Sequence, residues 1–227
     1  MSEMTQDTDK PAIRDAATIL LVRNAGTAPA VLMGQRGSGA AFMPDKYVFP
    51  GGAVDAGDAQ VPLAGALNPT CQARLALDHP APMALAAAAI RELWEETGLA
   101  LGRPGAWDSP AEGWQGFAAR GLRPDASALR YIFRAITPPG RTRRFDARFF
   151  LARASAVAGD ADDFSAACEE LSHLHWVPMA EARRLNLPFI TEVVLAEAEA
   201  LLRGEPGADS VPFFDNRTDE SVFRRIA

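Results

Sequence analysis

The chain has few of the residues that cross-link small domains or hold zinc, with two cysteines and three histidines among 227 residues. Cys71 and Cys168 stand in alanine-rich surroundings, without the paired spacing that a zinc site or a redox dithiol needs. We therefore expect two free thiols. The sequence also lacks any apolar run of about 18 residues, the length that a membrane-spanning helix requires. It predicts neither a disulfide scaffold nor a membrane protein.

Positive charge is in the minority as well. The 23 lysines and arginines are outnumbered by 29 aspartates and glutamates, for a formal net charge of -6. A chain without an overall positive field does not attract a polyanion, so we expect no nucleic acid polymer as partner. Residues 1–11 lack the basic and then apolar pattern of a secretory signal, which favours a cytoplasmic location.

The composition is that of a globular protein, with 48% hydrophobic and 23% charged residues. We expect a disordered leader at residues 1–11, one domain at residues 12–204 and a C-terminal tail at residues 205–227. Residues 59–82 hold four prolines and no clear apolar period, so we interpret them as an insertion into the domain. The insertion fits a substrate lid, a contact in a homodimer, or a decoration without a role.

Apolar periodicity predicts both strands and helices. Short apolar runs between turns indicate strands of one sheet at residues 17–23, 31–36, 46–50, 131–136, 144–153 and 173–177. Residues 83–97 are good helix formers followed by Gly98, where a C-cap is expected. Residues 191–202 have the pattern of an amphipathic helix.

The chemistry is concentrated in residues 91–99, which read RELWEETGL. The period of about 3.6 residues places Glu92, Glu95 and Glu96 on one side of the predicted helix. Carboxylates so close repel one another unless a cation compensates them, and a hard divalent ion is the natural candidate. The alternative is an ordinary solvated helix face, supported by an i,i+4 pair between Arg91 and Glu95.

A glycine turn precedes this helix. Gly51 and Gly52 follow Pro50, and Asp55 and Asp58 add carboxylates behind them. Because glycine has no Cβ, a backbone carbonyl there can join a metal shell. Loop and helix together predict an acidic pocket for Mg²⁺ or Mn²⁺. Such a pocket suits a small-molecule diphosphate, because Mg²⁺ prefers a few carboxylates together with phosphate oxygens.

These residues resemble the Nudix box, G-x5-E-x7-R-E-U-x-E-E-x-G-U, in which U is bulky and aliphatic. Gly52 stands at its first glycine, and residues 91–99 match every specified position of its second half. Asp58 replaces the first glutamate, and 32 residues separate it from Arg91, so 25 residues interrupt the box. The chain is therefore identified as a member of the Nudix hydrolases. The resemblance implies an α/β/α sandwich, with a mixed sheet between helices.

The resemblance also implies a metal site. Its expected ligands are Glu92, Glu95 and Glu96, together with the carbonyl of Gly52 and the shorter carboxylate of Asp58. Glu92 and Glu95 are expected to be catalytic as well.

Several family members carry a further glutamate in a loop before a tryptophan-bearing strand, as a metal ligand or as the base that activates water. Glu170, six residues before Trp176, matches that place, and Glu169 is the alternative.

The interrupted box is similar to that of the Nudix hydrolases that act on coenzyme A and its esters, as are residues 42–55 and 144–150. This implies cleavage to 3',5'-ADP and phosphopantetheine or its acyl form. Arg141, Arg143 and Arg144 are candidates for bidentate binding of phosphate, with a solvated turn as the alternative. ADP-ribose, NADH or a dinucleoside polyphosphate is the alternative substrate. A Nudix-fold module that binds nucleotides without hydrolysis is the alternative function.

Overall fold

The computed structural model describes residues 11–79, 81–205 and 210–227. Its helices are α1 (Pro69–Ala76), α2 (Pro82–Thr97), α3 (Gln115–Ala119), α4 (Met179–Ala182) and α5 (Phe189–Leu202), with short 3-10 helices η1 (Ala56–Gln60) and η2 (Ala154–Ala156). Its strands are β1 (Ile13–Arg23), β2 (Ala30–Arg36), β3 (Tyr47–Val48), β4 (Gly51–Ala53), β5 (Gly102–Pro104), β6 (Leu122–Pro124), β7 (Arg130–Ile136), β8 (Arg144–Arg153), β9 (Leu171–Pro178), β10 (Val211–Asp215) and β11 (Val222–Ile226).

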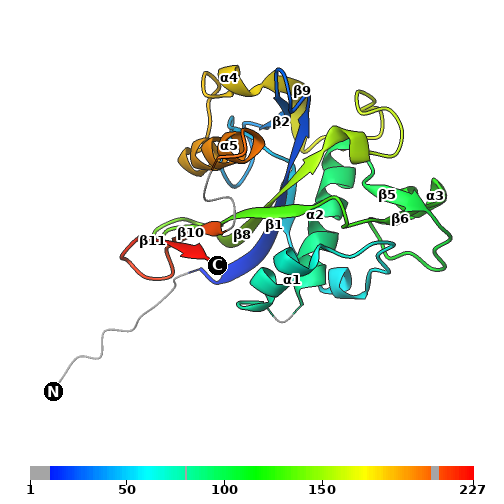
Figure 1. Cartoon of the computed structure of the whole chain (residues 1–227), viewed down its shortest axis with the longest axis horizontal. Helices are drawn as coiled ribbons and strands as arrows, with labels where there is room; N and C mark the ends of the chain where they lie inside the picture. Colours follow the sequence, from blue (N-terminus) through cyan, green and yellow to red (C-terminus); the bar gives the residue numbers. More distant parts are fainter. Residues whose placement is uncertain (1–10, 80, 206–209) are drawn as a thin grey trace.

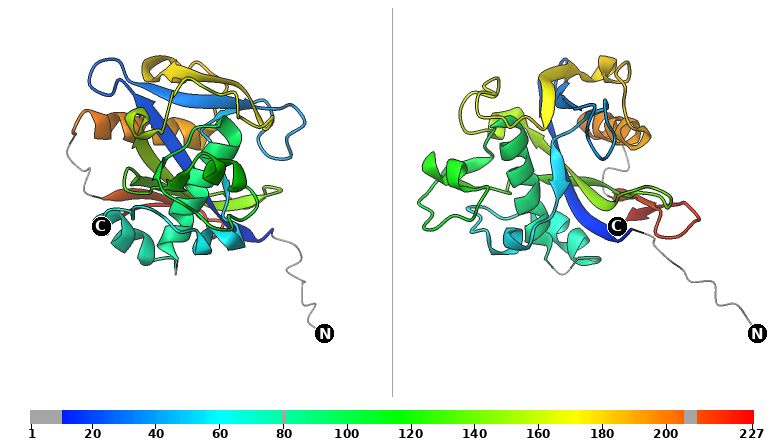
Figure 2. Two further views of the ribbon diagram at one scale, coloured as in Figure 1. Left: turned by 90° about the vertical axis from the view of Figure 1, so that its right-hand side faces the viewer. Right: turned by 180° about the vertical axis from the view of Figure 1, so that it is seen from behind.

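The architecture is a mixed sheet between two helical layers. Helices α1 and α2 lie on one face and α5 lies on the other (Figure 1). The two further views show the same layering (Figure 2). The predicted α/β sandwich is confirmed. Among the helices of the described residues, none has the length and hydropathy needed to span a bilayer.

Strand β1 is the axis of the sheet. It pairs in parallel with β8, from Ile13 opposite Arg144 to Val22 opposite Arg153. Its other edge is shared between β4, at residues 16–18, and β2, at residues 22–23. The full order is β11-β10-β7-β8-β1-β2-β3, with β4 on β1 and β9 on β2. Sharing the edge places the glycines of β4 directly against α2.

The continuous apolar run of β1 is explained by burial on both faces. Ile19 and Leu21 pack in the core on the α2 side, whereas Leu20 and Val22 pack in the core on the α5 side. This follows from the period of about two residues in a strand, which points successive side chains to opposite faces.

Helix α2 packs closely on the sheet because the side chains on its inner surface are small. Residues 86–89 are four alanines, all without solvent exposure. Pro82 stands in the first turn, and Gly98 ends the helix in the left-handed conformation, with φ of 73°. The Thr97 hydroxyl donates to the carbonyl of Leu93 at 2.5 Å. These features set where α2 begins and ends, and so where the turn that carries the glutamates lies.

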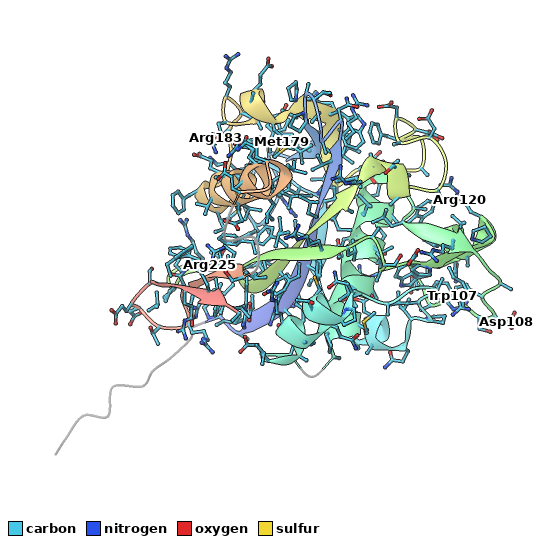
Figure 3. All side chains as sticks on the ribbon, viewed as in Figure 1. Trp107, Asp108, Arg120, Met179, Arg183 and Arg225 are labelled. Atoms are coloured by element: carbon cyan, nitrogen blue, oxygen red, sulfur yellow. The ribbon has the colours of Figure 1, made fainter. Side chains whose placement is uncertain are left out.

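Most of the predicted elements are confirmed, with their ends moved by a few residues. The strand predicted at residues 46–50 is reduced to β3 at residues 47–48, and Gly51 and Gly52, predicted as a turn, lie in β4 because they pair with β1. Three features were not expected from the sequence. A small sheet of β5 and β6 with α3 forms a separate lobe, in which Trp107, Asp108 and Arg120 lie (Figure 3). The segment interpreted as an insertion contains α1, whose Leu75 belongs to the core beneath α2. The predicted C-terminal tail contributes β10 and β11 to the main sheet, next to β7.

Candidate active site

The deepest carboxylate of the site is Glu96, which is only 2% exposed. Its Oε2 accepts a hydrogen bond from the backbone N–H of Gly51 at 2.7 Å. Its Oε1 is buried and has no hydrogen-bond partner among the described residues. Burial with one unsatisfied oxygen is costly for a carboxylate, so this side chain is arranged for a group that supplies positive charge.

Glu92 lies against β4, the glycine segment that the sequence predicted as a turn. A Cβ built on Gly52 would come within 2.5 Å of the carboxyl carbon and both carboxylate oxygens of Glu92. Only glycine therefore leaves room for this carboxylate at the turn. The structure brings together Gly52, Glu92 and Glu96, as the sequence predicts.

Arg91 is the central cation of the cluster. Its guanidinium donates to Glu92 Oε1 at 2.9 Å, to Glu95 Oε2 at 3.0 Å and to the carbonyl of Ala53 at 2.8 Å. Glu95 is the most exposed of the three helix glutamates, with a third of its side chain accessible. Arg91 thus holds the outer two glutamates and leaves Glu96 to the backbone.

Asp58 takes a different position from the one expected of a metal ligand. It is 3% exposed, and both of its oxygens face Arg91, at 3.0 Å from Nε and 3.1 Å from Nη2. One of these oxygens also accepts from the N–H of Asp55 at 2.8 Å. With its oxygens engaged in this way, Asp58 orients Arg91 in the structure.

Burial makes the charged forms of Glu92 and Glu96 unfavourable. Burial raises the pKa of Glu92 to about 7, although the neighbouring Arg91 acts to lower it. Burial and the charge of Glu92 raise the pKa of Glu96 well above its usual range, against the opposing hydrogen bond from Gly51. Both shifts have the sign expected for like charges in a partly desolvated site.

A divalent cation fits the chemistry of these residues. In the parts of the chain that the structure describes, no three His, Cys, Asp or Glu side chains are already gathered as a metal-binding group. The glutamates nevertheless offer what a hard cation takes, namely carboxylate oxygens, one of them buried without a partner. Because Gly52 has no side chain, its backbone lies directly beside the Glu92 carboxylate, in space that a Cβ would fill.

Glu170 lies close enough to the cluster to raise the pKa of both Glu92 and Glu96. It immediately precedes β9, and it accepts a hydrogen bond from Arg36 Nη2 at 2.6 Å. Its loop is held on the end of α2, where the N–H of Cys168 donates to the carbonyl of Glu95 at 3.0 Å. The structure therefore brings Glu170 to the site, while its exposed neighbour Glu169 has no such ion pair.

The three candidate phosphate-binding arginines differ in position. Arg144 is buried, and its guanidinium donates to the carbonyls of Thr137 at 3.0 Å and Asn216 at 2.6 Å. Arg141 and Arg143 are exposed on the turn between β7 and β8. Of the three, only Arg143 is among the residues that line the cavity next to the site. Arg144 has a structural position, because its guanidinium is occupied by backbone carbonyls.

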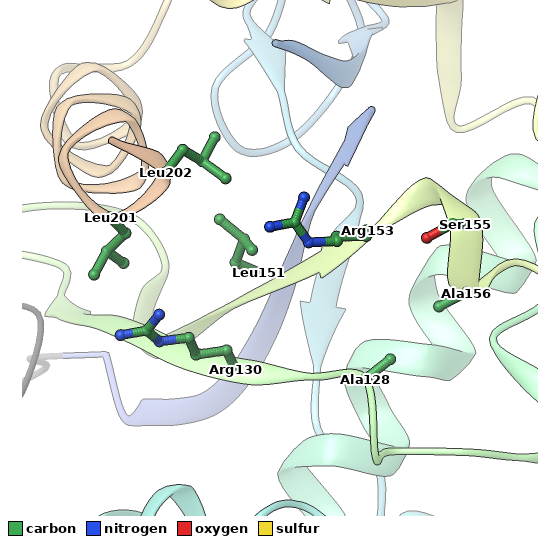
Figure 4. A pocket seen from close by; sticks show the side chains of 8 residues that line it. All are labelled: Ala128, Arg130, Leu151, Arg153, Ser155, Ala156, Leu201 and Leu202. Carbon is green, nitrogen blue, oxygen red and sulfur yellow. The ribbon is translucent and has the colours of Figure 1, made fainter. Parts of the chain in front are cut away.

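Two cavities, each of about 370 Å³, are present on the described surface. One is lined by Arg36 at the end of β2, by residues 37 and 39–42 of the loop that follows, and by Arg143 and Glu170. The other lies between the sheet and α5, with Arg130, Arg153, Leu151 and Leu202 around it (Figure 4). No carboxylate lines this second cavity, so it is not where a cation and a diphosphate would meet.

Two contacts of the structure were not predicted from the sequence, and one of them lies at the site. Arg36, the partner of Glu170, lies 134 residues away along the chain and follows no motif that we identified. A buried ion network beneath the sheet was also missed, in which Arg134 donates to both oxygens of Asp146 at 2.8 and 2.7 Å. Only the register of β7 on β8 reveals it, because that register sets Arg134 beside Arg148 and both near Asp146.

Comparison with known proteins supports the predicted fold. No family model matches the chain, and no curated protein matches it. A Nudix hydrolase from Alicyclobacillus acidocaldarius is 28% identical, with 85% of this chain and 96% of that protein covered at a TM-score of 0.60. An Ap4A hydrolase from C. elegans, solved as a binary complex, is 15% identical, with 85% and 99% covered at a TM-score of 0.50.

These similarities confirm the predicted Nudix fold, for which the C. elegans structure is evidence of fold alone. They support the Nudix family and the predicted class of enzyme, a hydrolase that acts on acid anhydrides.

Proposed function

We propose that the protein is a metal-dependent hydrolase that cleaves the diphosphate bond of a nucleoside diphosphate linked to another moiety. The observation that carries this proposal is the buried carboxylate of Glu96, which has one oxygen without a partner and lies beside Glu92 at the glycine turn. Such an arrangement is costly for an apo protein and becomes favourable when a cation binds.

Glu92, Glu95 and Glu96, with the carbonyl of Gly52, would hold Mg²⁺ or Mn²⁺. When bound, the cation would neutralise phosphate charge and make water a better nucleophile. Arg91 holds Glu92 and Glu95 in place through hydrogen bonds of 2.9 and 3.0 Å, and Asp58 orients Arg91. We assign Asp58 this supporting role in preference to metal binding.

Glu170 is the residue that we propose as general base. It stands outside α2, next to the glutamates, and its half-exposed carboxylate can accept a proton from water. Glu92 and Glu95 would act in catalysis through the cation that they hold. Arg143, on the rim of the adjacent cavity, is placed to bind a phosphate oxygen.

For the substrate, we propose coenzyme A or acyl-coenzyme A, giving 3',5'-ADP and phosphopantetheine or its acyl form. The interrupted box and its flanking sequences favour this choice. The alternative substrates are ADP-ribose, NADH and a dinucleoside polyphosphate, which present the same diphosphate chemistry to the same carboxylates.

The proposal is tested with a product-resolved hydrolysis panel in Mg²⁺ and in Mn²⁺. The panel contains coenzyme A, acetyl- and longer acyl-coenzyme A, ADP-ribose, NADH and diadenosine polyphosphates. Glu96→Gln is the inactive comparison, and Glu169→Gln is the matched variant of an exposed glutamate. We expect release of 3',5'-ADP from coenzyme A species to exceed turnover of the other substrates, and to need the cation.

Each outcome has a distinct meaning. Preference for another diphosphate would contradict the substrate and leave the reaction in place. Absence of turnover across the panel, with ligand-induced stabilisation of the fold, would favour a nucleotide-binding module without catalysis. Equal rates for wild type and Glu96→Gln would overturn the assignment of the site.

A further inference from the structure

The cavity beside the glutamates has the chemistry of an anion site. It has a volume of about 370 Å³, and its lining includes Arg36, Phe42, Arg143 and Glu170. Two arginines from separate parts of the chain thus face one hollow. Among the described residues, Arg143 makes no hydrogen bond or ion pair within the protein, so its donors are available to a ligand.

Arg36 is only partly used by the protein. Its Nη2 donates to Glu170 Oε1 at 2.6 Å, whereas its Nε is buried without a hydrogen-bond partner. A buried donor without a partner is uncommon in native structures, so the hydrogen-bonding capacity of this guanidinium is incompletely satisfied by the protein. A phosphate group can accept two parallel hydrogen bonds from one guanidinium, which a single contact to Glu170 does not provide.

We propose that Arg36 is exchanged between two acceptors. Without substrate it binds Glu170, and with substrate it binds a phosphate group seated between Arg36 and Arg143, which releases Glu170 beside the glutamates of α2. This inference rests on the proposed function, because Glu170 is the base assigned there. It makes Arg36 a positioning residue whose contact with substrate prepares Glu170 for reaction.

The energies favour such an exchange. The Arg36–Glu170 pair lies at the surface, with 20% and 53% of the two side chains exposed. Ion pairs near the surface contribute little to stability, so this pair is easily broken. Charge-assisted hydrogen bonds from two arginines to one phosphate are together stronger than the single Arg36–Glu170 hydrogen bond that they replace. Substrate is therefore the stronger acceptor for Arg36.

The exchange affects the site because Glu170 lies next to the glutamates of α2. Glu170 lies close enough to Glu92 and Glu96 for its charge to act on both. Held by Arg36, its carboxylate is partly neutralised and one oxygen is engaged. Released, both oxygens are available to accept a proton. The ion pair thus restrains the base until an anion occupies the cavity.

The test measures binding of ADP in EDTA by titration calorimetry, so neither a cation nor turnover contributes. Adenosine is the uncharged comparison. We expect Glu170→Gln to bind ADP about three- to fivefold more tightly than wild type, since the competing carboxylate is gone. Arg36→Gln is expected to weaken binding at least about tenfold. In the Arg36→Gln background, the effect of Glu170→Gln should fall below about twofold, because the two residues act as a pair.

Matched variants separate the exchange from general electrostatics. Glu169→Gln removes the same charge from the neighbouring exposed position and should change ADP affinity by less than about twofold. Arg143→Gln, at an exposed residue that does not contact Glu170, should weaken binding while preserving the gain from Glu170→Gln. Thermal unfolding confirms that each variant folds. If Arg36→Gln does not fold, Arg36→Lys replaces it, because lysine keeps the positive charge but lacks the planar guanidinium.

Several results would overturn the exchange. One is an equal rise in ADP affinity in Glu169→Gln and in Glu170→Gln. Another is a gain in ADP affinity from Glu170→Gln that is the same in the wild-type and the Arg36→Gln backgrounds. The third is that wild type does not bind ADP in EDTA. Because the assay requires no hydrolysis, these results would leave the proposed reaction standing. Conversely, a protein that binds ADP as expected but hydrolyses nothing in the panel would contradict the proposed function alone.

Discussion

Asp58 and Arg91 form a two-point ion pair across 33 positions of the chain, with Nε–Oδ1 and Nη2–Oδ2 distances of 3.0 and 3.1 Å. The inserted residues between them do not separate them. Because Arg91 also holds Glu92 and Glu95, this pair connects η1 to the glutamate-bearing turn of α2.

Removing Asp58 should therefore destabilise the protein as well as the site. We expect Asp58→Ala to lower the free energy of unfolding by about 3 kcal/mol, because a buried guanidinium loses its main partner. Asp55, whose carboxylate is 63% exposed and 3.6 Å from Arg91, is the matched control. Asp55→Ala should cost less than about 1 kcal/mol. Urea unfolding of both variants provides the measurement, and equal losses would contradict a special role for Asp58.

The two glycines of β4 should respond differently to the same substitution. A Cβ on Gly51 would lie 2.7 Å from the carbonyl oxygen of Ala17 and the Cα of Thr18, which are backbone atoms that cannot yield. A Cβ on Gly52 would meet the carboxylate of Glu92, which can rotate away.

We therefore expect Gly51→Ala to lower stability by about 2–3 kcal/mol, and Gly52→Ala to stay within about 1 kcal/mol of wild type. Gly52→Ala should still lose about 100-fold or more in kcat, because Glu92 is displaced from its working position. Thermal unfolding and steady-state hydrolysis separate the two effects. A stable Gly52→Ala enzyme with normal kcat would show that Glu92 need not lie at the turn.

Binding of a divalent cation should stabilise the fold through the glutamates of α2. At a concentration of 100 times its dissociation constant, Mn²⁺ is expected to add about 2.7 kcal/mol to the free energy of unfolding of wild type. Glu96→Gln should abolish most of this gain, while its carbonyl oxygen keeps the hydrogen bond from Gly51. Removal of the cation with EDTA should reverse the gain. Denaturation with and without Mn²⁺ tests this, and a full gain in Glu96→Gln would contradict the proposed site.

The C-terminal hairpin should show a pH-dependent contribution through Asp215. Hydrogen bonds from Arg217 hold the pKa of this carboxyl below its usual value, and Arg224 adds a contact at 2.7 Å. A folded pKa below the unfolded value, which is about 3.9, means that the stabilisation is present above pH 4 and is lost as pH falls through the folded pKa.

Asp215→Asn is expected to lower the free energy of unfolding by about 1–3 kcal/mol at pH 7. The difference from wild type should shrink steadily as pH falls below about 4. Glu220→Gln, at an exposed residue of the connecting turn, provides the control and should show no such trend. Urea unfolding at several pH values is the measurement. A pH-independent difference would mean that Asp215 acts through packing instead of charge.

The sequence by itself determined the main elements and the centre of the site. Strand β1 was recognisable because both of its faces are buried, which gives a continuous apolar run. The glutamates of α2 were recognisable because helical periodicity alone places them on one side, and the paired glycines require a close backbone approach. These are local properties, fixed by residues a few positions apart.

The tertiary structure decided what depends on register and long-range packing. Arg144 and Arg143 are adjacent in sequence, yet one is buried against carbonyls and the other lines the cavity, because Arg144 is the first residue of β8 and Arg143 still belongs to the exposed turn before it. The partner of Glu170 comes from β2, and the last two strands of the sheet come from the C-terminal segment. No local pattern encodes these neighbours, since the free energy that selects them comes from closing the whole sheet and its two cores.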